Sequence, residues 1–220
     1  MIVRNPEKPA SAGTHSDALV SLLDIVPTVL EWFTIPVPQY TIFKKPVTFT
    51  GSSLLSLLDT RRPVSPESRD FVYASHSLHE ITMYYPMRMI RSVNMKLVHN
   101  LNYKMPFPID QDFYVSPTFQ DMLNRTKHGE PLCWSKTLDS YYYRDEWELY
   151  DLNRDPNELY NIVRNETYAP VLLKLKQLLF KWQQTTHDPW ICAPHSVLED
   201  SGAYKQDPKC LPLLNAQRGK

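Results

Sequence analysis

Near the N-terminus, apolar positions recur at steps of three and four residues, which is the spacing of one face of an α-helix. The residues on this face are Leu19, Leu22, Leu23, Val26, Val29, Leu30 and Phe33. The pattern predicts a buried amphipathic helix from Ser16, whose hydroxyl can cap the first turn, to about Phe33. Pro27 lies inside this range and lacks a backbone N–H, so we expect a kink or a break near Val26.

Further along the chain, short runs of β-branched, aromatic and other apolar residues predict strands. These runs are residues 71–74, 87–91, 96–100, 141–144 and 147–152. Residues 34–70 and 101–140 are rich in Pro and are expected to be long ordered loops, the first with one helical turn at 54–58. The segment Asp155-Pro-Asn-Glu158 predicts a turn.

A second helix is predicted from Pro170, a residue suited to a first helical turn, to about Gln184. Its apolar face consists of Leu172, Leu175, Leu179 and Trp182. We expect this helix to cover one face of the antiparallel strands that precede it. One helix, then strands, then a covering helix is the pattern of an α+β unit appended to a larger protein.

The charge and composition exclude several classes of protein. The 220 residues contain 24 Lys and Arg and 24 Asp and Glu, so the formal net charge is zero. No global field draws the chain onto nucleic acid or an anionic membrane, and we expect neither as a partner. The longest apolar stretch, Ser21 to Ile35, is interrupted by Asp24, Pro27 and Glu31, so no transmembrane helix is expected.

Cysteines and sequons bear on the compartment. Cys133, Cys192 and Cys210 are either three thiols, or Cys192 and Cys210 form a disulfide that closes a tail with little apolar content. Asn124-Arg-Thr and Asn165-Glu-Thr are acceptor sequences for N-glycosylation. Together they favour an oxidising, secretory compartment, yet the N-terminus has no signal-peptide pattern, so we expect the chain to lack its beginning.

The most concentrated candidate chemistry lies next to a predicted strand, where His76 and His79 are close in sequence to the carboxylate of Glu80. A zinc site would need a further ligand, and the spacing does not match the helical His-Glu-x-x-His arrangement, so no metal site is expected. These side chains either line a polar pocket or are structural. Arg88 can pair with Glu80 or bind an anionic substrate group through its planar guanidinium. The candidate substrate-pocket residues are therefore His79, Glu80 and Arg88.

No catalytic residue stands out. Cys192-Ala-Pro-His-Ser196 has the cysteine and proline of the Cys-x-Pro-x-Arg sequence that sulfatases convert to formylglycine, but a serine replaces the arginine. Asp110 and Asp112 lie in a Pro-rich segment, where we expect them to cap helices or form turns.

Several stretches of the chain nevertheless resemble the sulfatase family. Residues 21–31 are similar to the helix that follows the last active-site segments of these enzymes, and residues 148–158 with Asn161 are similar to their C-terminal strand and turn. A closer resemblance is to the branch of the family that removes N-linked sulfate from glucosamine in heparan sulfate. It is carried by residues 79–88, 97–120 and 187–190.

The resemblance implies an α/β sulfatase-like fold of the alkaline-phosphatase type. Residues 1–88 would be the end of the catalytic α/β domain. Residues 89–220 would be an α+β C-terminal domain, with a small antiparallel sheet covered by a helix and a disulfide-closed tail. Asn124 and the pair Cys192 and Cys210 fit the glycosylation and the disulfide of the family, whereas Cys133 has no family role.

The resemblance also implies a lysosomal hydrolase that acts on oligosaccharides derived from heparan sulfate and forms a homodimer. Its formylglycine nucleophile and calcium ion would lie upstream, because the nucleophile, calcium-binding and sulfate-binding residues of the family have no counterpart in this sequence. We therefore expect this chain alone to be inactive and its first helix to expose an apolar face.

Two other classes of protein stay open. A non-catalytic carbohydrate-binding or dimerisation module would fold alone and bind glycan without turnover. A cytosolic metal hydrolase that uses His76 and His79 would contain bound zinc and reduced cysteines.

Overall fold

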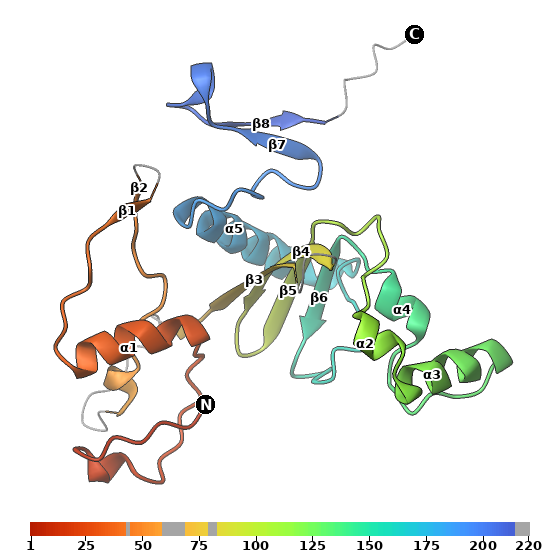
Figure 1. Ribbon diagram of the computed structural model, residues 1–220, viewed down its shortest axis with the longest axis horizontal. Helices are drawn as coiled ribbons and strands as arrows, with labels where there is room; N and C mark the ends of the chain where they lie inside the picture. The colour runs from red at the N-terminus through yellow and green to blue at the C-terminus, as the bar shows by residue number, and fades with distance from the viewer. Residues whose placement is uncertain (43–44, 59–68, 79–82, 214–220) are drawn as a thin grey trace. The chain divides into compact units, whose positions relative to one another are not determined.

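The computed structural model describes residues 1–42, 45–58, 69–78 and 83–213 (Figure 1). The chain divides into two compact units, Met1–Val72 and Tyr73–Lys220, which we describe separately. The domain boundary at residue 88 is implied by the family resemblance and is a different kind of division from these compact units. It stays a prediction. Within the described ranges, none of the helices has the length and apolar character needed to cross a membrane.

The predicted N-terminal amphipathic helix is capped by Ser21 and not by the expected Ser16. The Ser21 hydroxyl accepts a hydrogen bond from the Leu23 amide (3.2 Å), and the Asp24 carboxylate accepts one from the Ser21 amide (2.9 Å). This reciprocal cap satisfies two amides that have no helical partner, so it fixes the start of the helix. The 3₁₀ turn η2 (Leu22–Asp24) then continues directly into α1 (Ile25–Trp32).

A kink or a break is expected near Val26, and α1 runs without interruption from Ile25 past Pro27. Pro27 is the third residue of α1, and in a first turn the missing N–H has no helical partner to lose. The change of helix type falls earlier, between Asp24 and Ile25. The rest of this unit contains η1 (Pro9–Ser11), a hairpin of β1 (Thr41–Ile42) and β2 (Lys45–Pro46), and the expected helical turn, η3 (Leu55–Leu58).

The apolar side chains along η2 and α1 are largely exposed. Leu22 is 77% exposed and Phe33 is 68% exposed, and Leu23, Val26 and Val29 are each about half exposed. The periodicity correctly predicts an amphipathic helix, but within this chain most of its apolar face is not buried. This agrees with the expectation that the helix exposes an apolar face.

The second unit is built on a four-stranded sheet in the order β3-β4-β5-β6 (Figure 1). Its strands are β3 (Val72–Leu78), β4 (Tyr84–Arg91), β5 (Met95–Asn100) and β6 (Trp147–Asp151). The three strands β4, β5 and β6 pair antiparallel, with Ile90 opposite Leu97 and Leu97 opposite Leu149. These three side chains are fully buried and form the centre of the core. The predicted strands at 71–74, 87–91, 96–100 and 147–152 are thus confirmed.

Helix α5 (Ala169–Thr185) packs on β4 and β5, as its sequence predicts. It follows the short turn η5 (Glu166–Tyr168), and Pro170 lies in its first turn. Leu175 and Leu179 on its inner face are buried, whereas Leu173 and Phe180 on the outer side are exposed. Burial of this stripe holds the helix on the sheet.

The connection from β5 to β6 is helical where loops are expected. It contains α2 (Gln111–Tyr114), α3 (Pro117–His128) and α4 (Leu138–Tyr142). The caps explain the difference, because Asp110, Ser116 and Thr137 each accept hydrogen bonds from the first amides of the helix that follows. Tyr141 and Tyr142 end α4, so the strand predicted at 141–144 is wrong.

The tail folds as a small hairpin of β7 (Ser196–Glu199) and β8 (Lys209–Pro212), with the turn η6 (Gly202–Tyr204) between them. A disulfide joins Cys192 to Cys210, with the Cα atoms 5.3 Å apart, so the disulfide hypothesis is confirmed. Cys133 is a free, exposed thiol.

Candidate functional site

The most deeply buried charged pair of the second unit is formed by Arg88 on β4 and Asp188, which follows α5. The Nε atom of Arg88 donates to Oδ2 of Asp188 (2.6 Å), and its Nη2 atom donates to Oδ1 (2.8 Å). Both residues are less than 10% exposed. The remaining Arg88 donor group, Nη1, reaches the carbonyl oxygens of His76 (3.1 Å) and Met87 (2.8 Å). This bidentate geometry fixes both side chains.

Asp188 is held in its charged form by its partners. Burial raises the pKa of this carboxyl, but hydrogen bonds from Arg88, Gln183 and the Trp190 amide outweigh burial, and the pKa lies below its ordinary value. The Gln183 amide donates to Oδ2 (2.9 Å), and the Trp190 backbone N–H donates to Oδ1 (3.0 Å). The pair therefore fastens the start of the tail to β4 and α5.

We refer to the ion pair of Arg88 and Asp188 as the clamp. Next to the clamp, a pocket of about 300 Å³ lies between the sheet and the tail. Its walls include Tyr84, Pro86, Asn102, Trp190, Pro194 and Ser196. The rings of Tyr84 and Trp190 are 5.8 Å apart and tilted by 53°, and they are 40% and 37% exposed. Two half-exposed aromatic rings in a concave site can bind a ligand that has both an apolar face and polar edges.

Of the three predicted pocket residues, Arg88 lies within the described part of the chain. His79 and Glu80 lie outside the described residues. Arg88 is engaged in the clamp with Asp188 rather than in the pocket wall, and the neighbouring His76 has its Nδ1 atom 3.0 Å from the Tyr85 carbonyl oxygen. Their role as substrate-pocket residues stays a prediction.

The partners in the clamp and pocket were not recognisable from the sequence. Asp188 is 100 residues from Arg88, and Trp190 is farther still. The stretch His187-Asp-Pro-Trp190 carries the family resemblance, and this is the signal that could have identified them.

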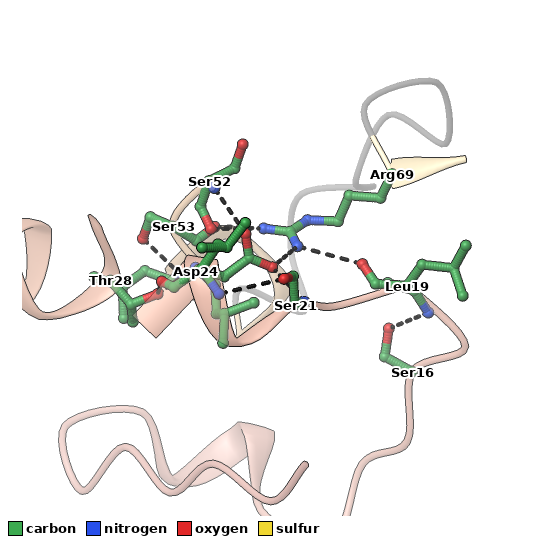
Figure 2. Close-up of polar contacts among 12 residues, drawn as sticks. Ser16, Leu19, Ser21, Asp24, Thr28, Ser52, Ser53 and Arg69 are labelled. Atoms are coloured by element: carbon green, nitrogen blue, oxygen red, sulfur yellow. Dashed lines mark hydrogen bonds and ion pairs between the residues drawn. The ribbon is translucent and has the colours of Figure 1, made fainter. Parts of the chain in front are cut away.

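A second polar cluster belongs to the first unit, and Figure 2 shows how it surrounds Asp24. The carboxylate accepts hydrogen bonds from Arg69 Nη1 (3.0 Å) and from the Ser52 amide (2.8 Å). It also accepts the hydrogen bond from the Ser21 amide that caps the helix. Arg69 also donates to the carbonyl oxygen of Ser53 (2.8 Å), and the Thr28 hydroxyl accepts from the Leu54 amide (2.9 Å). The charged groups of this cluster bind one another and the backbone, so the cluster ties η2 and α1 to residues 52–54.

A third cluster surrounds His99 on β5. Its ring stacks on Trp147 with the centroids 3.7 Å apart and the planes 7° apart. Its Nε2 atom is 3.5 Å from Oε1 of Glu146 but forms no hydrogen bond among the described residues. The pKa of His99 is lowered to about 4, mainly by burial and also by Lys176 and His195, while Glu146 opposes the shift. His99 is therefore a buried neutral histidine.

The sequon asparagines are both exposed. Asn124 lies on α3, and Asn165 precedes η5, where its Oδ1 atom accepts a hydrogen bond from the Thr167 amide (3.0 Å). Asp110 caps α2, as expected for an aspartate in a Pro-rich segment.

The donor sets do not fit the cofactors that the sulfatase resemblance implies. Among the described residues, no three His, Cys, Asp or Glu side chains come together as metal ligands. Cys192 and Cys210 are bonded to each other, and Cys133 is followed by Trp and Ser rather than by the x-Pro-x-Arg of a formylglycine sequence. The described residues therefore supply neither a calcium site nor a formylglycine sequence.

Comparisons with known proteins define the class. The fold resembles the crystal structure of a phosphonate monoester hydrolase of Agrobacterium radiobacter, with a TM-score of 0.52 and 19% identity over 83% of this chain and 28% of that one. In sequence, the chain is 26% identical to an ulvan-active sulfatase of Formosa agariphila over 80% of its own length and 31% of that protein. The chain thus shares its fold with this hydrolase and part of its sequence with a sulfatase.

Two further matches are more specific. Residues 134–185 match the model of the family described as N-sulphoglucosamine sulphohydrolase, C-terminal. The chain is 52% identical to human N-sulphoglucosamine sulphohydrolase over 98% of its own length and spans 41% of that protein. The chain is therefore a close relative of the C-terminal portion of N-sulphoglucosamine sulphohydrolase.

Proposed function

We propose that this chain is the C-terminal part of a lysosomal sulfohydrolase that removes N-linked sulfate from glucosamine residues during heparan sulfate degradation. The observation that carries the proposal is the 52% identity with human N-sulphoglucosamine sulphohydrolase over 98% of the chain. The disulfide between Cys192 and Cys210 supports a compartment of the secretory route, because disulfides persist in oxidising surroundings. The exposed sequons at Asn124 and Asn165 support the same compartment and are proposed to be glycosylated.

In the whole protein, residues 1–88 would end the catalytic domain and residues 89–220 would form the C-terminal domain. The exposed apolar side chains of α1 support this division, because a helix with such a face is stable in water only when another surface covers it. We propose that the remaining part of the enzyme covers this face and supplies the formylglycine and the calcium ion. This chain spans 41% of the length of the human relative, so the remaining length of such a protein could form that part.

Within this chain, His79, Glu80 and Arg88 are the proposed contributors to the substrate pocket. Arg88 would act through the clamp with Asp188, because its described donors already bind protein acceptors. The whole protein is further proposed to be a homodimer, which size-exclusion chromatography with light scattering would test.

Sulfate release from N-sulfoglucosamine by the full-length protein, purified from its tissue of origin, tests the proposed function. We expect turnover at acidic pH, and we expect residues 1–220 alone to release no sulfate because the nucleophile and metal are proposed to lie elsewhere. N-acetylglucosamine 6-sulfate is the matched control substrate. Release of sulfate from the control alone would refute the proposed specificity, and release from neither compound would refute the proposed activity.

A further inference from the structure

The pocket beyond the clamp has two features of a built binding site. The backbone at Trp190 is held in place, because Oδ1 of Asp188 accepts a hydrogen bond from the Trp190 amide (3.0 Å) and another from Nη2 of Arg88 (2.8 Å). Its aromatic surface is accessible, because Tyr84 and Trp190 keep more than a third of their surface exposed while their rings remain in contact. Rigid aromatic groups bind ligands at a low entropic cost.

The polar groups of the pocket are available for a ligand. Among the described residues, none hydrogen-bonds to the side-chain amide of Asn102 or to the hydroxyl of Ser196, and both residues line the pocket. An amide and a hydroxyl can each donate and accept, as sugar hydroxyls require. The described residues that line the pocket include no Asp or Glu, so no carboxylate in the wall repels an anionic sugar.

The volume also fits a sugar ring. About 300 Å³ accommodates one ring but not a long segment of an oligosaccharide. Lys104 follows Asn102 by two residues, but its Nζ atom lies 5.8 Å from the centre of the Tyr103 ring and Lys104 does not line the pocket, and the charge of Arg88 is paired with Asp188. His195 is also close, but it faces the Glu146 carboxylate (3.3 Å).

We propose that this pocket binds one sugar ring of a sulfated oligosaccharide, with the apolar face of the ring on Trp190 and Tyr84 and its hydroxyls on Asn102 and Ser196. The assignment to sulfated glucosamine oligosaccharides rests on the proposed function, whereas the assignment to a sugar rests on the pocket itself.

Equilibrium binding tests the proposal without depending on turnover. The probe is a heparan-type tetrasaccharide of N-sulfated glucosamine and uronic acid, titrated into the full-length protein by calorimetry. We expect Trp190→Leu to raise the Kd about tenfold, which is the loss of one good aromatic contact. Asn102→Ala, which leaves the aromatic rings and the clamp in place, is expected to raise it several-fold. Trp134→Leu is the matched control, because Trp134 is also half-exposed but lines a different cavity.

The outcomes separate this proposal from the proposed function. An unchanged Kd in both Trp190→Leu and Asn102→Ala would overturn the pocket assignment even in a protein that releases sulfate from N-sulfoglucosamine. Weakened binding in both variants of a protein without that activity would support the pocket and refute the proposed function. Equal affinity of the wild-type protein for uncharged cellotetraose would overturn the preference for a sulfated ligand.

Discussion

The buried histidine His99 gives a quantitative prediction about pH and stability. Its ring is 8% exposed and stacks on Trp147, and the groups that face it are Glu146, Lys176 and His195. Burial lowers its pKa from 6.5 to about 4, so the folded protein keeps this ring neutral at a pH where the unfolded chain protonates it.

The direction of the effect follows from this lowered pKa. Above pH 6.5 both states are neutral at His99, and the stability contribution is fully present. As the pH falls towards about 4, the unfolded chain gains a proton that the folded state does not bind, and the free energy of unfolding decreases. The decrease attributable to His99 is about 2 kcal/mol at pH 5 and about 3 kcal/mol at pH 4.

The assay is urea unfolding of the wild-type protein and of His99→Phe at pH 7.5 and pH 5.0. Phenylalanine keeps the stacking on Trp147 and cannot be protonated, so we expect the variant to lose about 2 kcal/mol less than wild type between the two pH values. His15→Phe is the control, because His15 is exposed and lies outside the helices and strands. Equal losses in wild type and His99→Phe would refute the reasoning, because the pH dependence would then arise from other groups.

Three further predictions concern folding. Gly51→Ala should destabilise the first unit by at least about 1 kcal/mol in thermal unfolding, because a Cβ atom there would lie 2.2 Å from the Leu23 carbonyl oxygen. Asp188→Ala should cost about 3–5 kcal/mol in urea unfolding because it leaves a buried, unpaired guanidinium, and Arg88→Met combined with Asp188→Leu should restore most of the loss. Cys210→Ser should destabilise the tail by about 3 kcal/mol, since it opens a loop of 18 residues, and limited proteolysis with mass spectrometry should then detect cleavage in the tail.

Local patterns were sufficient to predict the sheet and α5. The strands β4, β5 and β6 contain runs of apolar and aromatic residues, and the stripe of Leu175 and Leu179 on α5 is long enough to show its period. The proline content of residues 101–140 predicts loops, whereas the structure has three helices between β5 and β6. Pro117 instead starts α3 directly after the Ser116 cap, where proline is favoured.

The sites were harder to predict because their partners are far apart in sequence. Arg88 could be singled out by its charge in an apolar strand, but no local pattern connects it with Asp188, which is 100 residues away. Asp24 and Arg69 are 45 residues apart, and only the fold brings their charges to within 3.0 Å. Long-range pairing depends on tertiary packing, which hydrophobic periodicity does not encode.

The tail is held by two constraints, the disulfide and the clamp, which act on different walls of the pocket. The disulfide joins Cys192 to Cys210 within the tail, so it stabilises the hairpin itself but does not attach the hairpin to the sheet. Attachment depends on the clamp at Asp188, which holds the amide of Trp190, and on the contact of His195 with Glu146 (3.3 Å). Reduction of the disulfide should therefore loosen the wall formed by β7, whereas loss of the clamp should displace the aromatic wall. We therefore expect that the pocket keeps its described geometry only when both the disulfide and the clamp are intact.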